Sequence, residues 1–462
     1  MRHVRLIPLA AEGNRVIRAP GVLARRELLV RGRDYTVRFG LRQTTARLEI
    51  AEGDEPDEAL ALGMSRAALD DLLLAPGMAC RLRVDQAVGL IEFGPLVGVL
   101  VSPAFLAAVA KGEAPTSARL HARAARAESA AVYYFTADGI DWERMSVEGW
   151  VPDGGGGRWS RRLLPLPGVV YDRAVYGNNR DRTLVSEARD RFGREPGVKP
   201  INTRHYLDKW WLHQGLAAHA GVRGCLPETA RYRGPADLEK FLGRHPRVFV
   251  KSFYGSGGME VLSLESVGSG RYICHTRRRR TVVEGLDQAA SLIRRFFDTD
   301  ELIVQAGIEV VHYKGSCVDM RSLVQKDATG DWSTPQIMLR VAKGDQPMTN
   351  LRQHGWAAPY GALMPRILGS VKAARDKFED ACALSLVLAR HIEHVYGPFG
   401  EIGLDLALDG KGRLWFLEAN AKPDKDPLPF EEGVDQVYPQ FRNIFAYAGF
   451  LAGFIGPYWL VG

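Results

Sequence analysis

The most constraining feature of this chain is a pair of apolar strands that carry polar side chains toward one another. Residues 401–408 and 413–420 are strand-like runs separated by a short glycine-containing turn, and this pattern predicts a β-hairpin. Successive side chains of a strand point to opposite faces, so Glu418 and Asn420 share a face. Folding about the turn brings Asp405 opposite Glu418. We therefore expect three oxygen-bearing side chains to converge on this hairpin.

Carboxylates in apolar strands need a compensating charge, because burying an unpaired charge is costly. An oxygen set from Asp, Glu and Asn suits magnesium better than zinc, which prefers nitrogen and sulfur ligands. Asp405, Glu418 and Asn420 are therefore interpreted as candidate magnesium ligands. The alternative interpretation is that Asp405 and Glu418 are paired with arginines.

Composition places the chain among ordinary globular proteins. Its 462 residues suggest about three domains. Hydrophobic residues make up 46% and charged residues 25%, which excludes a disordered, collagen-like or coiled-coil chain. The net charge of +7 favours acidic small molecules as partners but is too small to indicate nucleic acid.

The cysteines and the termini bear on the compartment. The five cysteines are scattered without a C-x-x-C pair, which argues against a disulfide framework or a zinc cluster and fits a reducing compartment. The first 20 residues hold too short an apolar stretch for a signal peptide, so we expect synthesis in the cytoplasm. Residues 443–462 carry no charge, but glycines and a proline interrupt them, and a buried terminal helix is favoured over a membrane span.

Hydrophobic periodicity divides the chain into three parts. Residues 1–90 alternate in short runs and predict a β-rich module. Residues 91–198 alternate buried-type strands with helical stretches, which predicts a compact α/β domain. Residues 199–462 form a longer third part. Its expected elements include helices at 206–218 and 285–297 and strands at 247–252 and 302–305.

A second motif is a strand that ends in Lys251 and runs into a glycine-rich loop. Gly255, Ser256, Gly257 and Gly258 form this loop, and glycines let backbone N–H groups approach phosphate oxygens closely. A plain tight turn is the alternative for the loop taken alone. No G-x-x-x-x-G-K-[ST] motif occurs in the sequence, so a P-loop nucleotide hydrolase is not expected.

Arginines in strand-like runs form a third motif. Asp319 and Arg321 share one face of a strand at 317–325, and Arg340 lies between two apolar residues in a later run. A buried guanidinium needs an anionic partner from the protein or from a substrate. A phosphate group is a good candidate for that partner.

The order of these motifs is more specific than any one of them. The chain resembles the ATP-grasp nucleotide site through, in order, Lys209, Lys251 with its loop, the strand at 302–308, Asp319-x-Arg321, Arg340, Thr349-Asn350, Asp405 and Glu418-x-Asn420. Within that superfamily, the segments GPLVGVLVS, VYYFTADGIDW, PLPGVVYDR, LDKWWLH and LWFLEANAKP resemble the YheC/YheD-type endospore coat-associated family. The resemblance extends over nearly the whole chain.

The resemblance implies a fold and a set of site residues. The implied fold class is α/β (α+β), with an ATP-grasp domain of two subdomains at 199–462, a pre-ATP-grasp α/β domain at 91–198 and a β-rich module at 1–90. The implied ATP-binding residues are Lys209, Lys251, Gly255, Ser256, Gly257, Gly258, Gln305, Ala306, Gly307, Ile308 and, for the ribose, Glu309. The implied ligands of one or two Mg²⁺ ions are Asp405, Glu418 and Asn420. The implied catalytic and acceptor-side residues are Arg340, for the transferred phosphoryl group, and Asp319, Arg321, Asn350 and Lys422.

The expected activity is that of an ATP- and magnesium-dependent ligase, in which a carboxylate is phosphorylated and an amine attacks the acyl phosphate. The cluster of Arg321, Arg340, Lys343 and Arg352 predicts an anionic small-molecule or peptide substrate. The resemblance also implies association with the spore coat and coat proteins as further partners, without nucleic acid or a membrane span. Two alternatives stay open: a nucleotide-binding or structural coat component without catalysis, and a kinase acting on a hydroxyl acceptor.

Overall fold

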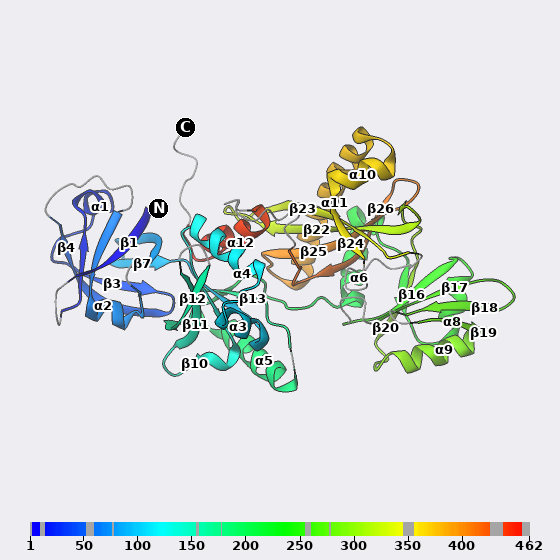
Figure 1. Ribbon diagram of the computed structural model, residues 1–462, viewed down its shortest axis with the longest axis horizontal. Helices are drawn as coiled ribbons and strands as arrows, with labels where there is room; N and C mark the ends of the chain where they lie inside the picture. The colour runs from blue at the N-terminus through cyan, green and yellow to red at the C-terminus, as the bar shows by residue number, and fades with distance from the viewer. Residues whose placement is uncertain are drawn as a thin grey trace. The chain divides into compact units, whose positions relative to one another are not determined.

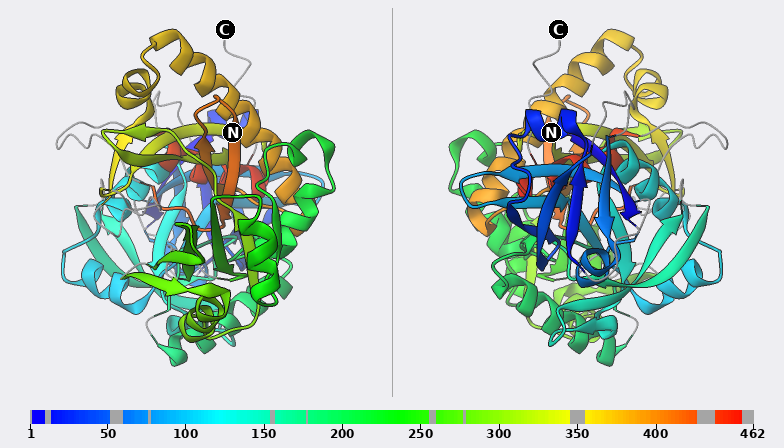
Figure 2. Two further views of the ribbon diagram at one scale, coloured as in Figure 1. Left: turned by 90° about the vertical axis from the view of Figure 1, so that its right-hand side faces the viewer. Right: turned by 90° about the vertical axis from the view of Figure 1, so that its left-hand side faces the viewer.

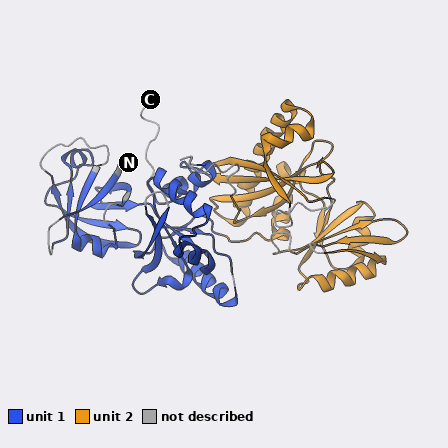
Figure 3. Cartoon of the chain, in the orientation of Figure 1, with its two compact units in different colours: residues 1–203, 326–331, 431–462 blue, residues 204–325, 332–430 orange. Residues whose placement is uncertain are grey.

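The chain folds into two compact units in the computed structural model (Figure 3). The first unit comprises residues 1–203, 326–331 and 431–462, and the second comprises residues 204–325 and 332–430. The structure describes residues 2–9, 14–51, 60–75, 78–153, 157–176, 178–254, 260–276, 279–344, 355–425 and 438–454.

The N-terminal strands close into a barrel, drawn in dark blue in the right-hand view of Figure 2. The strands follow the spatial order β1-β5-β2-β4-β3-β7-β6. Tyr35, Val37 and Phe39 alternate along β3 and are fully buried, as expected when one face of a strand fills a barrel. The elements are β1 (Arg2–Leu9), β2 (Val16–Ala19), α1 (Gly21–Arg26), β3 (Asp34–Phe39), β4 (Arg42–Ile50), β5 (Leu60–Ser65), α2 (Arg66–Asp71), β6 (Ala79–Asp85) and β7 (Leu90–Gly94).

An α/β sheet follows the barrel within the first unit. Its order is β10-β11-β9-β8-β13-β14, with β12 paired to β11, and β8, β9, β13 and β14 run parallel. Parallel neighbours require crossover connections, which α3 and α4 provide between β8 and β9. The elements are β8 (Leu96–Leu100), α3 (Pro103–Ala110), α4 (Thr116–Ala127), β9 (Ala131–Phe135), β10 (Ile140–Asp141), β11 (Ser146–Asp153), β12 (Arg158–Pro165), β13 (Val169–Asp172), α5 (Asn179–Arg194) and β14 (Lys199–Pro200).

The last helix of the chain, α12 (Pro439–Leu451), packs in this first unit. Phe441, Ile444 and Phe445 are buried in one core cluster with residues of β8, β9 and β13. A buried terminal helix is therefore confirmed for these residues. Within the described part of the chain, no helix combines the length and apolarity that a bilayer crossing requires.

The second unit begins with an antiparallel sheet of order β15-β20-β16-β17-β18-β19 (Figure 1). Helices α8 and α9 cover one face, where Leu238, Phe241 and Ile293 pack on the sheet. The elements are α6 (Lys209–Ala217), α7 (Ala220–Arg223), β15 (Thr229–Arg231), α8 (Pro235–Leu242), β16 (Arg247–Ser252), β17 (Val261–Ser266), β18 (Arg271–His275), β19 (Arg280–Glu284), α9 (Gly285–Phe296) and β20 (Leu302–Ala306).

A second sheet completes this unit, in the order β24-β23-β22-β25-β26, with β21 paired to β22. Ala381, Leu388 and Ile392 of the long helix α11 are buried in its core cluster. The predicted hairpin at 401–420 is confirmed as β25 and β26. The elements are β21 (His312–Tyr313), β22 (Ser316–Lys326), β23 (Trp332–Val341), β24 (Trp356–Pro359), α10 (Tyr360–Leu368), α11 (Val371–Tyr396), β25 (Glu401–Leu408) and β26 (Leu414–Asn420).

A buried ion pair joins the barrel to the rest of the first unit. Arg81 on β6 donates to the Glu128 carboxylate at 2.8 Å, and also to the backbone oxygens of Glu128 and Phe454. The side chains of Arg81 and Glu128 are 4% and 3% exposed. Arg442 of α12 donates to the second oxygen of Glu128, so one carboxylate connects three segments of the chain.

Replacing Arg81 by methionine is expected to lower the free energy of unfolding of the first unit by about 3 kcal/mol, because Glu128 loses its buried partner. Urea unfolding followed by circular dichroism measures this loss. Arg66→Met is the matched control, since Arg66 pairs with Asp70 on the surface, and its effect should stay below about 0.5 kcal/mol. Equal losses in the two variants would contradict the role given to Arg81.

Candidate functional site

The two faces of the β16–β20 sheet have different surroundings, because side chains alternate along each strand. Val248, Val250 and Val304 point into the core under α8 and α9. The intervening positions carry Lys251, Ile303 and Gln305, which line a pocket on the opposite face.

This pocket lies within the second unit. Its walls are mostly apolar. They come from α6 and Leu207 just before it, from Leu226 and Pro227 ahead of β15, and from the strands β16, β20 and β26. The apolar lining residues are Leu207, Leu212, Leu226, Pro227, Ile303, Phe416, Leu417 and Ala419. The polar lining residues are Lys209, His213, Lys251, Gln305 and Glu418. The predicted residues Lys209, Lys251, Gln305 and Glu418 therefore meet in one place.

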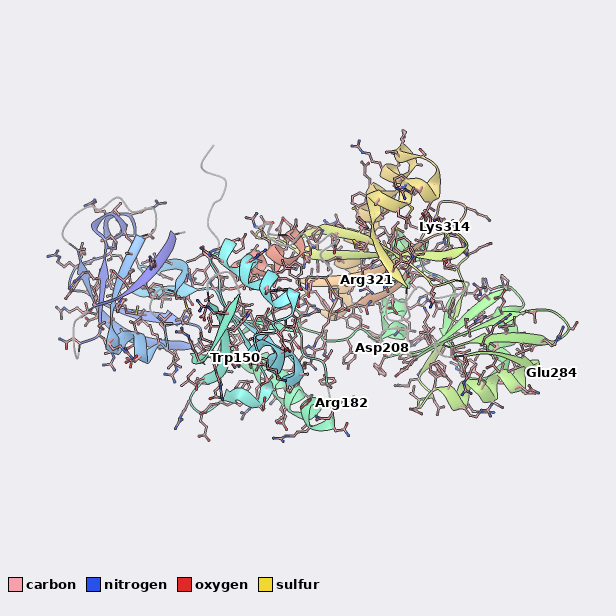
Figure 4. All side chains as sticks on the ribbon, in the orientation of Figure 1. Trp150, Arg182, Asp208, Glu284, Lys314 and Arg321 are labelled. Atoms are coloured by element: carbon pink, nitrogen blue, oxygen red, sulfur yellow. The ribbon has the colours of Figure 1, made fainter. Side chains whose placement is uncertain are left out.

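Helix α6 presents Lys209 and His213 to the pocket. Asp208, labelled in Figure 4, caps this helix by accepting a hydrogen bond from the Trp211 N–H at 2.7 Å. The Lys209 N–H donates to the Phe253 carbonyl oxygen at 3.0 Å, which ties the helix start to the chain after β16. His213 lies one turn further on the same face, and burial lowers the pKa of its imidazole, which favours the neutral ring.

His213 is a lining residue that the sequence interpretation missed. Its spacing of four residues from Lys209 is the signal that would have placed it on the pocket side of the helix.

Lys251 is buried, and its ammonium group donates to the Gln305 side-chain oxygen at 2.6 Å. Burial lowers the pKa of Lys251 to about 8, and the positive charge of Lys209 acts in the same direction. The carboxylates of Glu418 and Asp405 raise this pKa but do not cancel the effect of burial.

Acidic and basic side chains alternate in a buried network on β22, β23 and β25. Arg340 donates to both oxygens of Asp319, at 2.7 and 2.6 Å, and lies 2.9 Å from Asp405. Arg321, labelled in Figure 4, donates to Asp405 at 2.5 Å. Burial alone would raise the pKa of Asp405, but Arg321 and Arg340 hold it below its ordinary value.

The hairpin has the predicted register. Asp405 lies opposite Glu418, and Gly403 lies opposite Asn420. The Asn420 amide is 3.5 Å from a Glu418 oxygen. Asp405 is paired with Arg321 and Arg340, so for this residue the structure shows the alternative interpretation, pairing with arginines.

The chemistry of the donor set fits magnesium, since Asp405, Glu418 and Asn420 offer hard oxygen atoms on adjacent strands. A metal at this place would share Asp405 with Arg321 and Arg340. Among the described residues, no group of three or more His, Cys, Asp and Glu side chains is placed to hold a metal ion; the predicted set contains two carboxylates and an amide.

The predicted adenine-binding stretch is engaged with the protein itself. The N–H groups of Ala306 and Gly307 donate to the carbonyl oxygens of Glu228 and Arg247 at 2.8 and 2.9 Å. A Cβ at Gly307 would lie 2.8 Å from the Arg247 oxygen, so this close approach requires glycine.

Ala306, Gly307, Ile308 and Glu309 are not among the pocket-lining residues, and Glu309 is exposed. The predicted contacts of this stretch with adenine and ribose stay predictions. Five predicted site residues lie outside the described residues: Gly255, Ser256, Gly257, Gly258 and Asn350.

Asp405 and Glu418 should differ in what they contribute to stability. Asp405→Asn is expected to lower the free energy of unfolding of the second unit by about 3 kcal/mol, because Arg321 and Arg340 lose their shared carboxylate. Glu418→Gln should change it by less than about 1 kcal/mol, since no ion pair involves Glu418 in the described part of the chain. Urea unfolding of the nucleotide-free protein compares the two variants.

The same comparison has a defined pH dependence. Because the folded-state pKa of Asp405 is lowered, its contribution is present above the ordinary aspartate pKa and is lost as the pH falls through the folded-state value. The stability difference between the parent protein and Asp405→Asn should therefore shrink below about pH 4. A difference that grows on acidification would contradict the pairing.

Comparisons with known proteins agree with this architecture. Residues 197–451 match the YheC/D-like ATP-grasp family. The chain is 25% identical over 370 residues to the endospore coat-associated protein YheD of Bacillus subtilis (strain 168), covering 78% of this chain and 80% of that protein. It is 21% identical over 298 residues to the endospore coat-associated protein YheC of the same organism, covering 64% and 81%.

Among solved structures, the fold is similar to that of the D-cycloserine synthetase DcsG, with a TM-score of 0.46 and 16% identity over 77% of this chain and 99% of that one. The family match over residues 197–451 confirms the predicted ATP-grasp fold class. Because the family match spans more than half of its residues, this chain belongs to the YheC/D-like ATP-grasp family.

Proposed function

We propose that this protein is an ATP- and magnesium-dependent ligase that joins a carboxylate to an amine through an acyl phosphate. The observation that carries the proposal is the pocket in which Lys209 and Lys251 meet Glu418. Cationic groups suited to phosphates thus line the same pocket as a carboxylate suited to a metal. Family membership supports the nucleotide part of the proposal.

ATP would bind with its base between the apolar walls of the pocket and its phosphates toward Lys209 and Lys251. Ile303, Leu226 and Phe416 are among the apolar lining residues, and a purine ring gains from burial against such side chains. Lys251 is held in place by Gln305, so little side-chain freedom is lost when a phosphate binds.

Asp405, Glu418 and Asn420 would hold one or two magnesium ions. When bound, the metal supplies charge neutralisation on the β- and γ-phosphates during transfer. Glu418 is the least constrained carboxylate of the set, because Asp405 already engages Arg321 and Arg340. The Asn420 amide nitrogen lies 3.5 Å from a Glu418 oxygen on the same strand.

Arg340 would stabilise the charge that develops on the transferred phosphoryl group and on the tetrahedral species. Both oxygens of Asp319 accept hydrogen bonds from the Arg340 guanidinium, so this arginine is oriented before a substrate binds. Arg321, whose side chain is 21% exposed, would face the acceptor side and favour an anionic small molecule or peptide.

One observation favours a second candidate, a nucleotide-binding or structural component of the spore coat without ligase activity. The charge network around Asp405 is satisfied by protein groups alone, so packing is a sufficient reason to keep these residues. Similarity to YheD and YheC supports coat association under either candidate, with coat proteins as further partners.

The test is hydroxamate formation. The protein is incubated with magnesium-ATP, pooled carboxylate metabolites and hydroxylamine, and ADP and hydroxamates are measured by mass spectrometry. We expect hydroxamate from the parent protein and a loss of at least ~100-fold in Glu418→Gln, which removes a metal ligand with little change in stability.

The other outcomes separate the alternatives. ATP binding with phosphorylation of a hydroxyl acceptor and no hydroxamate would identify a kinase. No hydroxamate and no ATP binding would replace the ligase proposal by the structural coat role.

A further inference from the structure

Gln305 bridges neighbouring strands through a hydrogen-bonded chain with one possible direction. The Thr229 hydroxyl on β15 donates its only proton to the Pro227 carbonyl oxygen at 2.9 Å. Its oxygen must therefore accept from the Gln305 amide nitrogen, which lies 3.0 Å away. This fixes the Gln305 amide so that its oxygen faces Lys251 at 2.6 Å.

The direct partner of Lys251 is thus a neutral group. The charged groups around its ammonium come from other elements: Lys209 from α6, Asp405 from β25 and Glu418 from β26. On its own strand, the Phe249 ring centroid lies 5.6 Å from the nitrogen. In the described part of the chain, no ion pair joins Lys251 to a carboxylate.

We propose that Gln305 is a positioning residue for Lys251: its neutral amide aims the ammonium group into the pocket and leaves the charge for the nucleotide phosphates. A carboxylate at this place would form an ion pair with the protonated lysine and offset its charge before a nucleotide binds. An apolar residue would leave the ammonium group without a hydrogen-bond acceptor. The proposal deepens the function proposed above and rests on nucleotide binding in this pocket.

The neutral partner of Lys251 has a consequence that a carboxylate at this place would not have. In the nucleotide-free protein, burial leaves Lys251 with a pKa of about 8, so it is only partly protonated in mildly alkaline solution. A phosphate beside the ammonium raises that pKa. Binding of a phosphate-bearing nucleotide therefore draws a proton from the buffer onto the Lys251 nitrogen.

Isothermal titration calorimetry of the full-length protein with ADP, in EDTA and in buffers of different ionisation enthalpy, measures this proton. We expect proton uptake on ADP binding, and it should grow as the pH is raised from about 7 to 9, because Lys251 of the nucleotide-free protein loses its proton over this range. Adenosine is the control ligand, because it fills the pocket without a phosphate and should bind without proton uptake.

Two variants test the role of Gln305 itself. Gln305→Glu should abolish the uptake, because a carboxylate keeps Lys251 protonated, and should weaken ADP by ~10-fold. Gln305→Met keeps the side-chain length without the acceptor, and should weaken ADP by a similar factor while leaving adenosine unchanged. Melting temperatures of both variants check that the sheet is intact.

Thr229→Val is the matched control for the direction of the amide. It removes the hydroxyl without changing the size of the side chain, which frees the Gln305 amide to turn, so ADP should weaken by only ~3-fold. Unchanged ADP affinity and unchanged proton uptake in folded Gln305→Met would overturn the positioning role. If neither ADP nor adenosine binds the parent protein, the proposed nucleotide function fails instead.

Discussion

The carboxylate of Asp405 is the point on which the second unit depends. It lies on the interior strand β25, is 5% exposed, and engages Arg321 from β22 and Arg340 from β23. Asp319 holds the other side of Arg340, so acidic and basic groups alternate across neighbouring strands. Buried charges persist only when such pairing offsets their desolvation. This network sets the orientation of Arg340 and Arg321 before any ligand is present.

The alternation of side chains along β16 and β20 separates packing from ligand binding. Valines on one face attach the sheet to α8 and α9, while Lys251, Ile303 and Gln305 face the pocket. The sheet therefore carries Lys251, which we propose as a phosphate ligand, and its neighbours contact the ammonium group and shift its pKa. Sites built on strands hold their geometry better than sites built on loops.

Much of this site could be predicted from sequence patterns. The hairpin and its register of Asp405 opposite Glu418 follow from a short turn and a period of two. Lys251 and Glu418 were predicted from separate motifs, Lys209 and Gln305 were implied by the ATP-grasp resemblance, and all four line one pocket. His213 was missed although its helical spacing from Lys209 was visible. The contact of Gln305 with adenine stays a prediction, and the structure adds that its amide contacts Lys251 and Thr229.

Some features of this protein thus follow from local sequence patterns, and others depend on contacts between residues far apart in the sequence. Strand and helix periods, which depend on neighbouring residues, indicated the alternation of strands and helices and the hairpin. The glycine-rich motif indicated Lys251, and the resemblance to the ATP-grasp superfamily supplied the fold class and Lys209. The order of strands in a sheet is not a local property, so the meeting of Arg321 and Arg340 at Asp405 depends on β22 lying between β23 and β25. The packing of α12 in the first unit likewise depends on a core formed by residues about 300 positions earlier in the chain. Only the tertiary structure decides such contacts, because burial rewards complementary surfaces regardless of their separation in sequence.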